Sequence, residues 1–148
     1  MQNRKKPYGT LDASYQAAGG YNGLITLVDR FYDYMDSLPE ASVIREMHPE
    51  TLDESKEKLA RFLSGWLGGP KRYQEKYGPI RIPMVHLHLD VGAAERDAWL
   101  LCMEKALDDS SYDAGFKTYL LDQLARPAER IREVTENRRA NESTPKDS

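Results

Sequence analysis

Residues 85–90 alternate apolar and polar side chains, and the polar positions are His86, His88 and Asp90. In a β-strand alternate residues share one face, so these three side chains would lie together. Two histidines and one carboxylate on one face are typical ligands of a mononuclear iron or zinc enzyme. A non-heme metal site is therefore one hypothesis for this chain.

A helical turn in the same place predicts something different. Positions 86 and 88 point about 200° apart around a helix, so only one of the two histidines faces a given pocket. The rest of the chain offers helices but no partner strand, and an isolated strand is not stable. We therefore expect the helical turn, in which His86 is either a ligand or an ordinary packed histidine.

The elements that must position these residues are helices. Apolar residues recur at helical spacing in four segments: Leu24 to Met35, Leu52 to Trp66, Ala94 to Leu107, and Phe116 to about Val134. Gly68-Gly69-Pro70 should end the second helix, and Pro127 should kink or divide the last one. Residues 71–82 lack the pattern and predict a loop, a segment that usually carries function. The fold class expected is all-α.

Length and charge limit the functions to be considered. At 148 residues the chain is expected to form one domain, at 13–135, with an N-terminal extension at 1–12 and a polar tail at 136–148. A net charge of -3 without clustered Lys and Arg argues against nucleic acid and membrane surfaces as partners. The single Cys102 lies in an apolar run and predicts a buried, reduced thiol. These features predict a cytoplasmic protein, as a monomer or weak homodimer.

An ordered set of residues resembles the group II truncated globins over roughly residues 13 to 135. Its members, in chain order, are Gly19-Gly20, Phe31-Tyr32, the Phe62 to Pro70 block, Tyr73, His86, and the Glu95 to Met103 block with Trp99. A single Gly-Gly or Trp means little, whereas the whole set in this order is specific. The resemblance implies a two-over-two helical sandwich around a heme b.

The resemblance also implies a role for particular residues. His86 would hold the iron as the proximal ligand, and His88 would face away from the heme. On the opposite face Tyr32, His48 and Trp99 would donate hydrogen bonds to a bound diatomic ligand. Pro83 and Val85 stand where basic residues commonly pair with the heme propionates. The remaining expected cofactor-binding residues are Ser55, Leu59, Phe62 and Leu63 in the pocket wall, and Tyr73 and Arg81 near the propionates.

The function implied is reversible binding of oxygen, carbon monoxide or nitric oxide, as in oxygen transport. Chemistry on oxygen, nitric oxide or peroxide is an alternative that would need a separate reductase, so the chain is not assigned as an enzyme. Two rival hypotheses stay open from the sequence. One is the non-heme metal enzyme on His86, His88 and Asp90, and the other is a cofactor-free helical interaction module.

Overall fold

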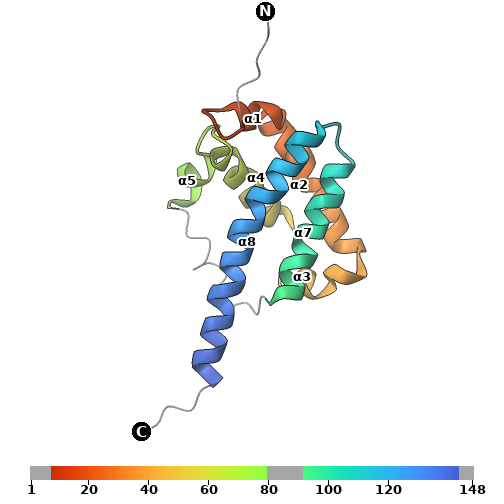
Figure 1. Cartoon of the computed structure of the whole chain (residues 1–148), viewed down its shortest axis with the longest axis vertical. Coiled ribbons are helices and arrows are strands. Elements are labelled where there is room, and N and C mark those ends of the chain that lie inside the picture. Colours follow the sequence, from red (N-terminus) through yellow and green to blue (C-terminus); the bar gives the residue numbers. More distant parts are fainter. Residues whose placement is uncertain (1–7, 80–91, 144–148) are drawn as a thin grey trace, which may run out of the picture.

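Helices make up the described part of the chain. The computed structural model describes residues 8–79 and 92–143, with side chains up to residue 137. These ranges contain no strand, which confirms the all-α prediction for them. The elements in chain order (Figure 1) are α1 (Ala13–Ala17), α2 (Gly20–Ser37), the 3-10 helix η1 (Pro39–Ala41), α3 (Ser42–Glu46), α4 (Asp53–Trp66), α5 (Arg72–Tyr77), α7 (Ala93–Asp108) and α8 (Ala114–Ser143).

The first amphipathic pattern forms α2, as predicted. Gly19 and Gly20 precede and begin this helix with φ of 88° and 68°, a left-handed conformation that glycine adopts without steric cost. The helix ends at Ser37 because Leu38, the residue before Pro39, is extended with ψ of 126°. One face of the helix is buried, and its members are Leu24, Leu27, Val28, Phe31, Tyr32 and Met35.

Two glycines allow the end of α4 to pack closely against the N-terminal segment. Gly68 has φ of 91°, and a Cβ there would lie 1.9 Å from the Leu11 carbonyl oxygen. A Cβ on Gly69 would lie 2.4 Å from the Tyr15 ring. The predicted stop at the Gly-Gly-Pro sequence is confirmed, since α4 ends at Trp66.

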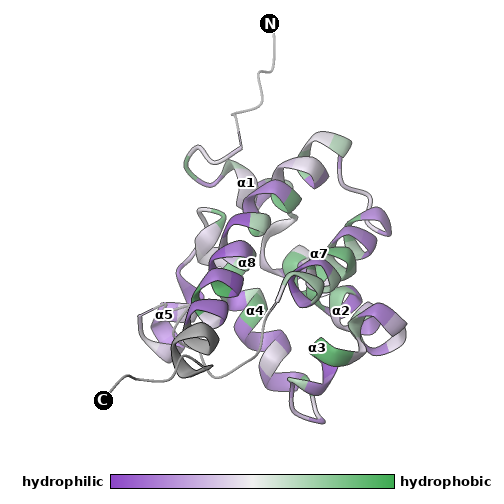
Figure 2. Cartoon of the chain, turned by 60° about the horizontal axis from the view of Figure 1, so that its bottom comes forward, coloured by the Kyte–Doolittle hydropathy of each residue, from purple (hydrophilic) through white to green (hydrophobic). Residues whose placement is uncertain are grey.

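The long helices pack in two pairs that α2 joins. In the described ranges α2 packs against both α4 and α7, α7 packs against α8, and α5 packs against α4. Figure 2 shows that hydrophobic stretches gather where α2, α3 and α7 meet, whereas α5 is mostly hydrophilic. The core therefore lies between the α2/α4 pair and the α7/α8 pair, the two-over-two arrangement that was expected.

The predicted loop at 71–82 is wrong in its first half, which forms α5. The rings of Tyr73 and Tyr77 lie one helical turn apart with centroids 5.1 Å from each other. Aromatic pairs at this spacing stabilise a helix, and packing against α4 stabilises it further. Gly78 ends the helix with φ of 84°. The segment 80–91, with the proposed strand or turn around His86, lies outside the described residues.

The last helix is longer than the periodicity predicted. It runs as one element from Ala114 to Ser143 with Pro127 inside it, so the proline does not divide it, and it passes the predicted end near Val134. Ion pairs one turn apart support its polar second half: Arg132 with Glu129 and Glu136, and Arg130 with Glu133. Within the described ranges, no helix is long and apolar enough to cross a membrane.

Candidate functional site

Tyr32 is a buried hydroxyl donor on the inner face of α2. Its residue surface is 4 % exposed, and its ring contacts the rings of Phe31 and His48. Burial raises the pKa of the phenol well above its ordinary value of 10, because the charged phenolate is poorly solvated there. The hydroxyl therefore keeps its proton and is available to donate it in a hydrogen bond.

His48 lies next to Tyr32, in the connection between α3 and α4. Its ring stands edge-on to the Tyr32 ring, with centroids 5.7 Å apart and an interplanar angle of 75°. Its Nδ1 lies 2.8 Å from the Ile44 carbonyl oxygen, and because a carbonyl only accepts, Nδ1 carries the proton. Burial is the largest cause that lowers the pKa of this ring, so the ring is neutral at pH 7. Nε2 of the neutral ring is then a hydrogen-bond acceptor, whereas the resemblance implied a donor at this position.

Trp99 completes a continuous row of rings across the core. It is half-buried on α7, and its ring centroid lies 4.9 Å from that of Phe31. Phe31 in turn contacts Tyr32 in a T-shaped pair at 4.9 Å. The row Trp99, Phe31, Tyr32 and His48 spans α7, α2 and the α3–α4 connection. The structure thus brings together the three residues expected on the ligand side.

The expected wall residues all lie on α4 and differ in how deeply they are buried. Ser55, Leu59 and Phe62 follow one another at spacings of four and three residues, so they share a helix face. All three are half-buried, and Leu59 and Phe62 pack against the edge of the core. Leu63 is fully buried and is a member of the core itself. The half-buried face offers an apolar surface that a flat, largely apolar group can cover.

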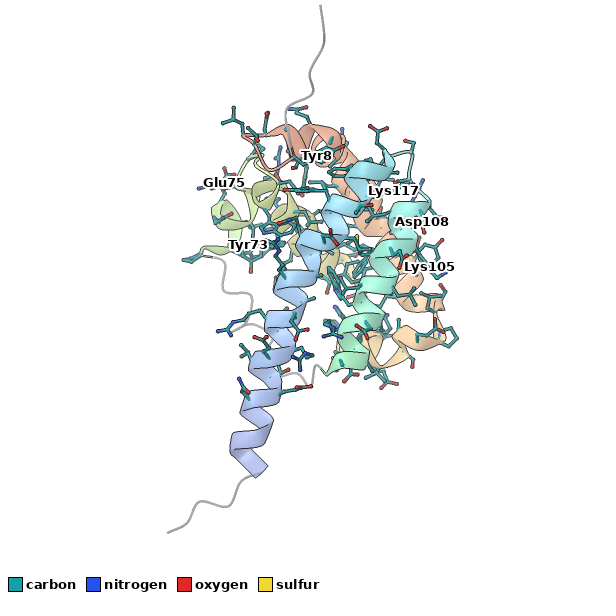
Figure 3. All side chains as sticks on the ribbon, viewed as in Figure 1. Tyr8, Tyr73, Glu75, Lys105, Asp108 and Lys117 are labelled. Carbon is teal, nitrogen blue, oxygen red and sulfur yellow. The ribbon has the colours of Figure 1, made fainter. Side chains whose placement is uncertain are left out.

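The residues expected near the propionates are only partly described. Tyr73 is half-buried on α5, and in Figure 3 it lies on the inner side of that helix, with the exposed Glu75 on the outer side. Lys76, which also comes from this segment, forms an ion pair with Glu57 on α4. Arg81 lies outside the described residues.

The metal-binding hypotheses fall on the segment that is not described. His86, His88 and Asp90 all belong to residues 80–91, so the iron ligand and the rival metal site are both outside the described chain. Elsewhere, in residues 8–79 and 92–143, no group of three or more His, Cys, Asp or Glu side chains could hold a metal ion.

Two residues beside the site were not singled out for a role from the sequence. Phe31 links the Tyr32 and Trp99 rings, and its place on the buried face of α2 is a signal for core packing only. Arg45 donates hydrogen bonds to the carbonyl oxygens of Pro49 and Glu50, directly after His48. An arginine at the end of a five-residue helix carries no sequence signal for such a role.

Comparisons with known proteins bear on what this site holds. The family model of the bacterial-like globins matches residues 13–133. The group 2 truncated hemoglobin YjbI of Bacillus subtilis is 32% identical over 127 residues, which cover 86% of this chain and 93% of that protein.

Solved structures agree with the sequence relatives. The group II 2-on-2 hemoglobin from the plant pathogen Agrobacterium tumefaciens is 35% identical with a TM-score of 0.77, over 88% of this chain and 97% of that one. The truncated oxygen-avid haemoglobin from Bacillus subtilis is 31% identical with a TM-score of 0.73, over 80% and 97% of the two chains. The chain belongs to the bacterial-like globin family, and within it to the group II truncated hemoglobins, which are heme proteins.

Proposed function

We propose that this hemoglobin binds heme b through His86 and holds oxygen or another diatomic ligand reversibly on the opposite heme face, beside Tyr32. The observation that carries the proposal is Tyr32, a buried side chain whose hydroxyl keeps its proton and whose ring lies beside His48. A protonated hydroxyl at this place is a donor that a ligand with partial negative charge can use as its hydrogen-bond partner.

The described residues fit a heme with a polar ligand. The half-buried apolar face of α4 suits the flat porphyrin, and its Leu59 and Phe62 side chains would keep water away from it. When bound, heme would supply an iron that takes His86 as its protein ligand and can bind a diatomic molecule. Tyr32, and Trp99 through its indole N–H, are the donors suited to a ligand that gains negative charge, as oxygen does.

The comparisons support oxygen as the ligand. The name of the similar Bacillus subtilis protein describes it as oxygen-avid, and Tyr32 offers the kind of donor that slows the loss of bound oxygen. Carbon monoxide and nitric oxide are expected to bind at the same position.

A spectrum of the purified protein tests the cofactor, and two histidine variants test its ligand. We expect a Soret band with about one heme per chain, and a pyridine hemochrome spectrum of heme b. His86→Ala should lose heme or bind it weakly, and the matched control His88→Ala should keep it.

Each other outcome has a definite meaning. Equal heme loss in both variants would remove the assignment of His86 and favour a shared metal site. Iron or zinc without a Soret band would support the non-heme metal enzyme. A protein that is purified with no cofactor and does not take up hemin would support the cofactor-free helical interaction module.

A further inference from the structure

Arg45 shapes the segment that carries His48. Residues 47–52, between α3 and α4, are irregular backbone. In this segment the carbonyl oxygens of Pro49 and Glu50 accept hydrogen bonds from the two terminal nitrogens of Arg45, at 2.9 and 2.8 Å. A guanidinium presents its N–H groups in one rigid plane, so two consecutive carbonyls bound in this way determine the path of the backbone.

The same guanidinium joins this segment to α2. Its third nitrogen, Nε, donates to the Asp36 carboxylate in an ion pair. Asp36 lies four residues after Tyr32, so the two side chains lie on neighbouring turns of one helix face. The Arg45 side chain is 23% exposed and is therefore partly shielded from solvent. Arg45 thus holds the irregular segment against the part of α2 that carries Tyr32.

His48 itself is hydrogen-bonded twice to the last turn of α3. Its backbone N–H donates to the Arg45 carbonyl oxygen at 3.1 Å, and its ring Nδ1–H donates to the Ile44 carbonyl oxygen at 2.8 Å. His48 therefore continues the last turn of α3, and the two carbonyls that the Arg45 side chain holds follow it directly in the chain.

We infer that Arg45 is a positioning residue of the ligand site. By fixing the segment around His48, Arg45 holds the His48 ring in its Nδ1–H tautomer, edge-on to Tyr32. The inference rests on the proposed function, because His48 matters to a ligand only if the ligand binds beside Tyr32. The positive charge of Arg45 also favours the neutral His48 ring, because it adds to the effect of burial in lowering the pKa of His48.

The tautomer of His48 is the direct test. We would record nitrogen-15 ring spectra of the full-length holoprotein in its diamagnetic carbon monoxide form, with the His48 signals assigned by their absence in His48→Gln. Wild type should show the Nδ1–H tautomer. Arg45→Lys keeps the charge but loses the planar fork, so it should show a mixture of both tautomers. Arg30→Lys is the matched control, because Arg30 lies on α2 and donates to the distant Asp109 carbonyl oxygen, and it should match wild type.

Oxygen dissociation rates test whether Arg45 acts through His48. We expect Arg45→Lys to change the rate by about threefold or more, in the same direction as His48→Gln. When His48 is already replaced by Gln, Arg45→Lys should not change the oxygen dissociation rate further, because the ring that Arg45 positions is absent. Far-ultraviolet circular dichroism of each variant confirms that the helices are retained.

The outcomes separate this inference from the proposed function. A pure Nδ1–H tautomer in Arg45→Lys, or additive rate changes in the double variant, would overturn the role of Arg45. If the chain takes up no heme, the proposed function fails, and the ring spectra of the full-length chain without heme still decide the tautomer.

Discussion

Tyr32 and Trp99 lie on two different helices but within one row of rings, and they differ in how deeply they are buried. Tyr32 is 4 % exposed on α2, whereas Trp99 is half-buried on α7. Both are donors at pH 7, because burial raises the pKa of the Tyr32 phenol and the indole N–H does not ionise. A ligand bound beside Tyr32, as proposed, would have these two side chains as candidate donors.

Removal of the Tyr32 hydroxyl should speed the loss of oxygen. Tyr32→Phe keeps the ring and its contacts with Phe31 and His48, but it deletes one hydrogen bond of about 1 to 1.5 kcal/mol. The oxygen dissociation rate should rise about tenfold, and the carbon monoxide rate should rise less, because bound carbon monoxide gains less negative charge. Stopped-flow measurements of both gases check this expectation.

Tyr34→Phe is the matched control, since the Tyr34 hydroxyl donates to Asp109 at the surface, and it should leave both rates unchanged. Trp99→Phe tests the second donor in the same way. If the two donors share one ligand, the double variant of Tyr32 and Trp99 should give non-additive rates. Equal acceleration of both gases would instead indicate a change in pocket access.

At the scale of the elements, two glycines that follow helices, Gly68 after α4 and Gly78 after α5, make a steric prediction. Gly68 and Gly78 both have a positive φ, 91° and 84°, so an alanine is strained at either position. A Cβ at Gly68 would also overlap the Leu11 carbonyl oxygen at 1.9 Å, whereas one at Gly78 meets no atom within 4 Å. Gly68→Ala should therefore be the more destabilising change, by about 1 to 3 kcal/mol.

Chemical denaturation of the two glycine variants, followed by circular dichroism, measures this difference. Equal losses of unfolding free energy would show that the N-terminal segment moves away from α4 at little cost.

The helices that the sequence predicted correctly are those specified by local patterns. α2 and α4 combine an apolar stripe with glycine or proline at their ends, and both signals are visible within one segment. α5 was missed because its six residues depend on packing against α4. The end of α8 after Val134 was missed because no apolar stripe continues into it, whereas an ion pair between Arg132 and Glu136 links it to the preceding turn.

The candidate site was predictable only as a set of residue types. Tyr32, His48 and Trp99 are far apart in sequence, and the resemblance to a family was needed to group them. The hydrogen bond from His48 to the Ile44 carbonyl could not be predicted, because it depends on the helical turn at residues 44–48, which no apolar pattern marks. For that reason the sequence predicted a donor at His48 where the structure has an acceptor.

At the scale of the whole molecule, α2 links the two helix pairs and also carries the centre of the site. Phe31 has 0% exposure, and its ring contacts Trp99 of α7 and Tyr32 of its own helix. Any shift of α7 relative to α2 would therefore move one donor relative to the other. The ligand site depends on the same packing that stabilises the fold.

Because the site and the fold share their packing, protonation of His48 should destabilise the molecule. Its pKa in the folded chain lies below the ordinary value of 6.5, with burial as the largest cause. The unfolded chain therefore takes up this proton first as the pH falls below about 6.5, and the folded state loses stability from there down to the folded pKa. One proton gives a slope of at most about 1.4 kcal/mol per pH unit, and the half-buried position of the ring reduces it.

His48→Gln isolates this contribution, because glutamine can still donate to the Ile44 carbonyl oxygen but does not titrate. Urea unfolding of the holoprotein between pH 7.5 and about 5 should show a steeper loss of stability for wild type than for the variant. Glu57 and Glu129 do not affect the comparison, because both proteins contain them. Their pKa values also lie below the ordinary 4.5, because Glu57 is hydrogen-bonded to Lys76 and Glu129 to Arg132. Parallel stability curves would mean that His48 reaches solvent freely when protonated, and that the edge-on contact with Tyr32 opens at little cost.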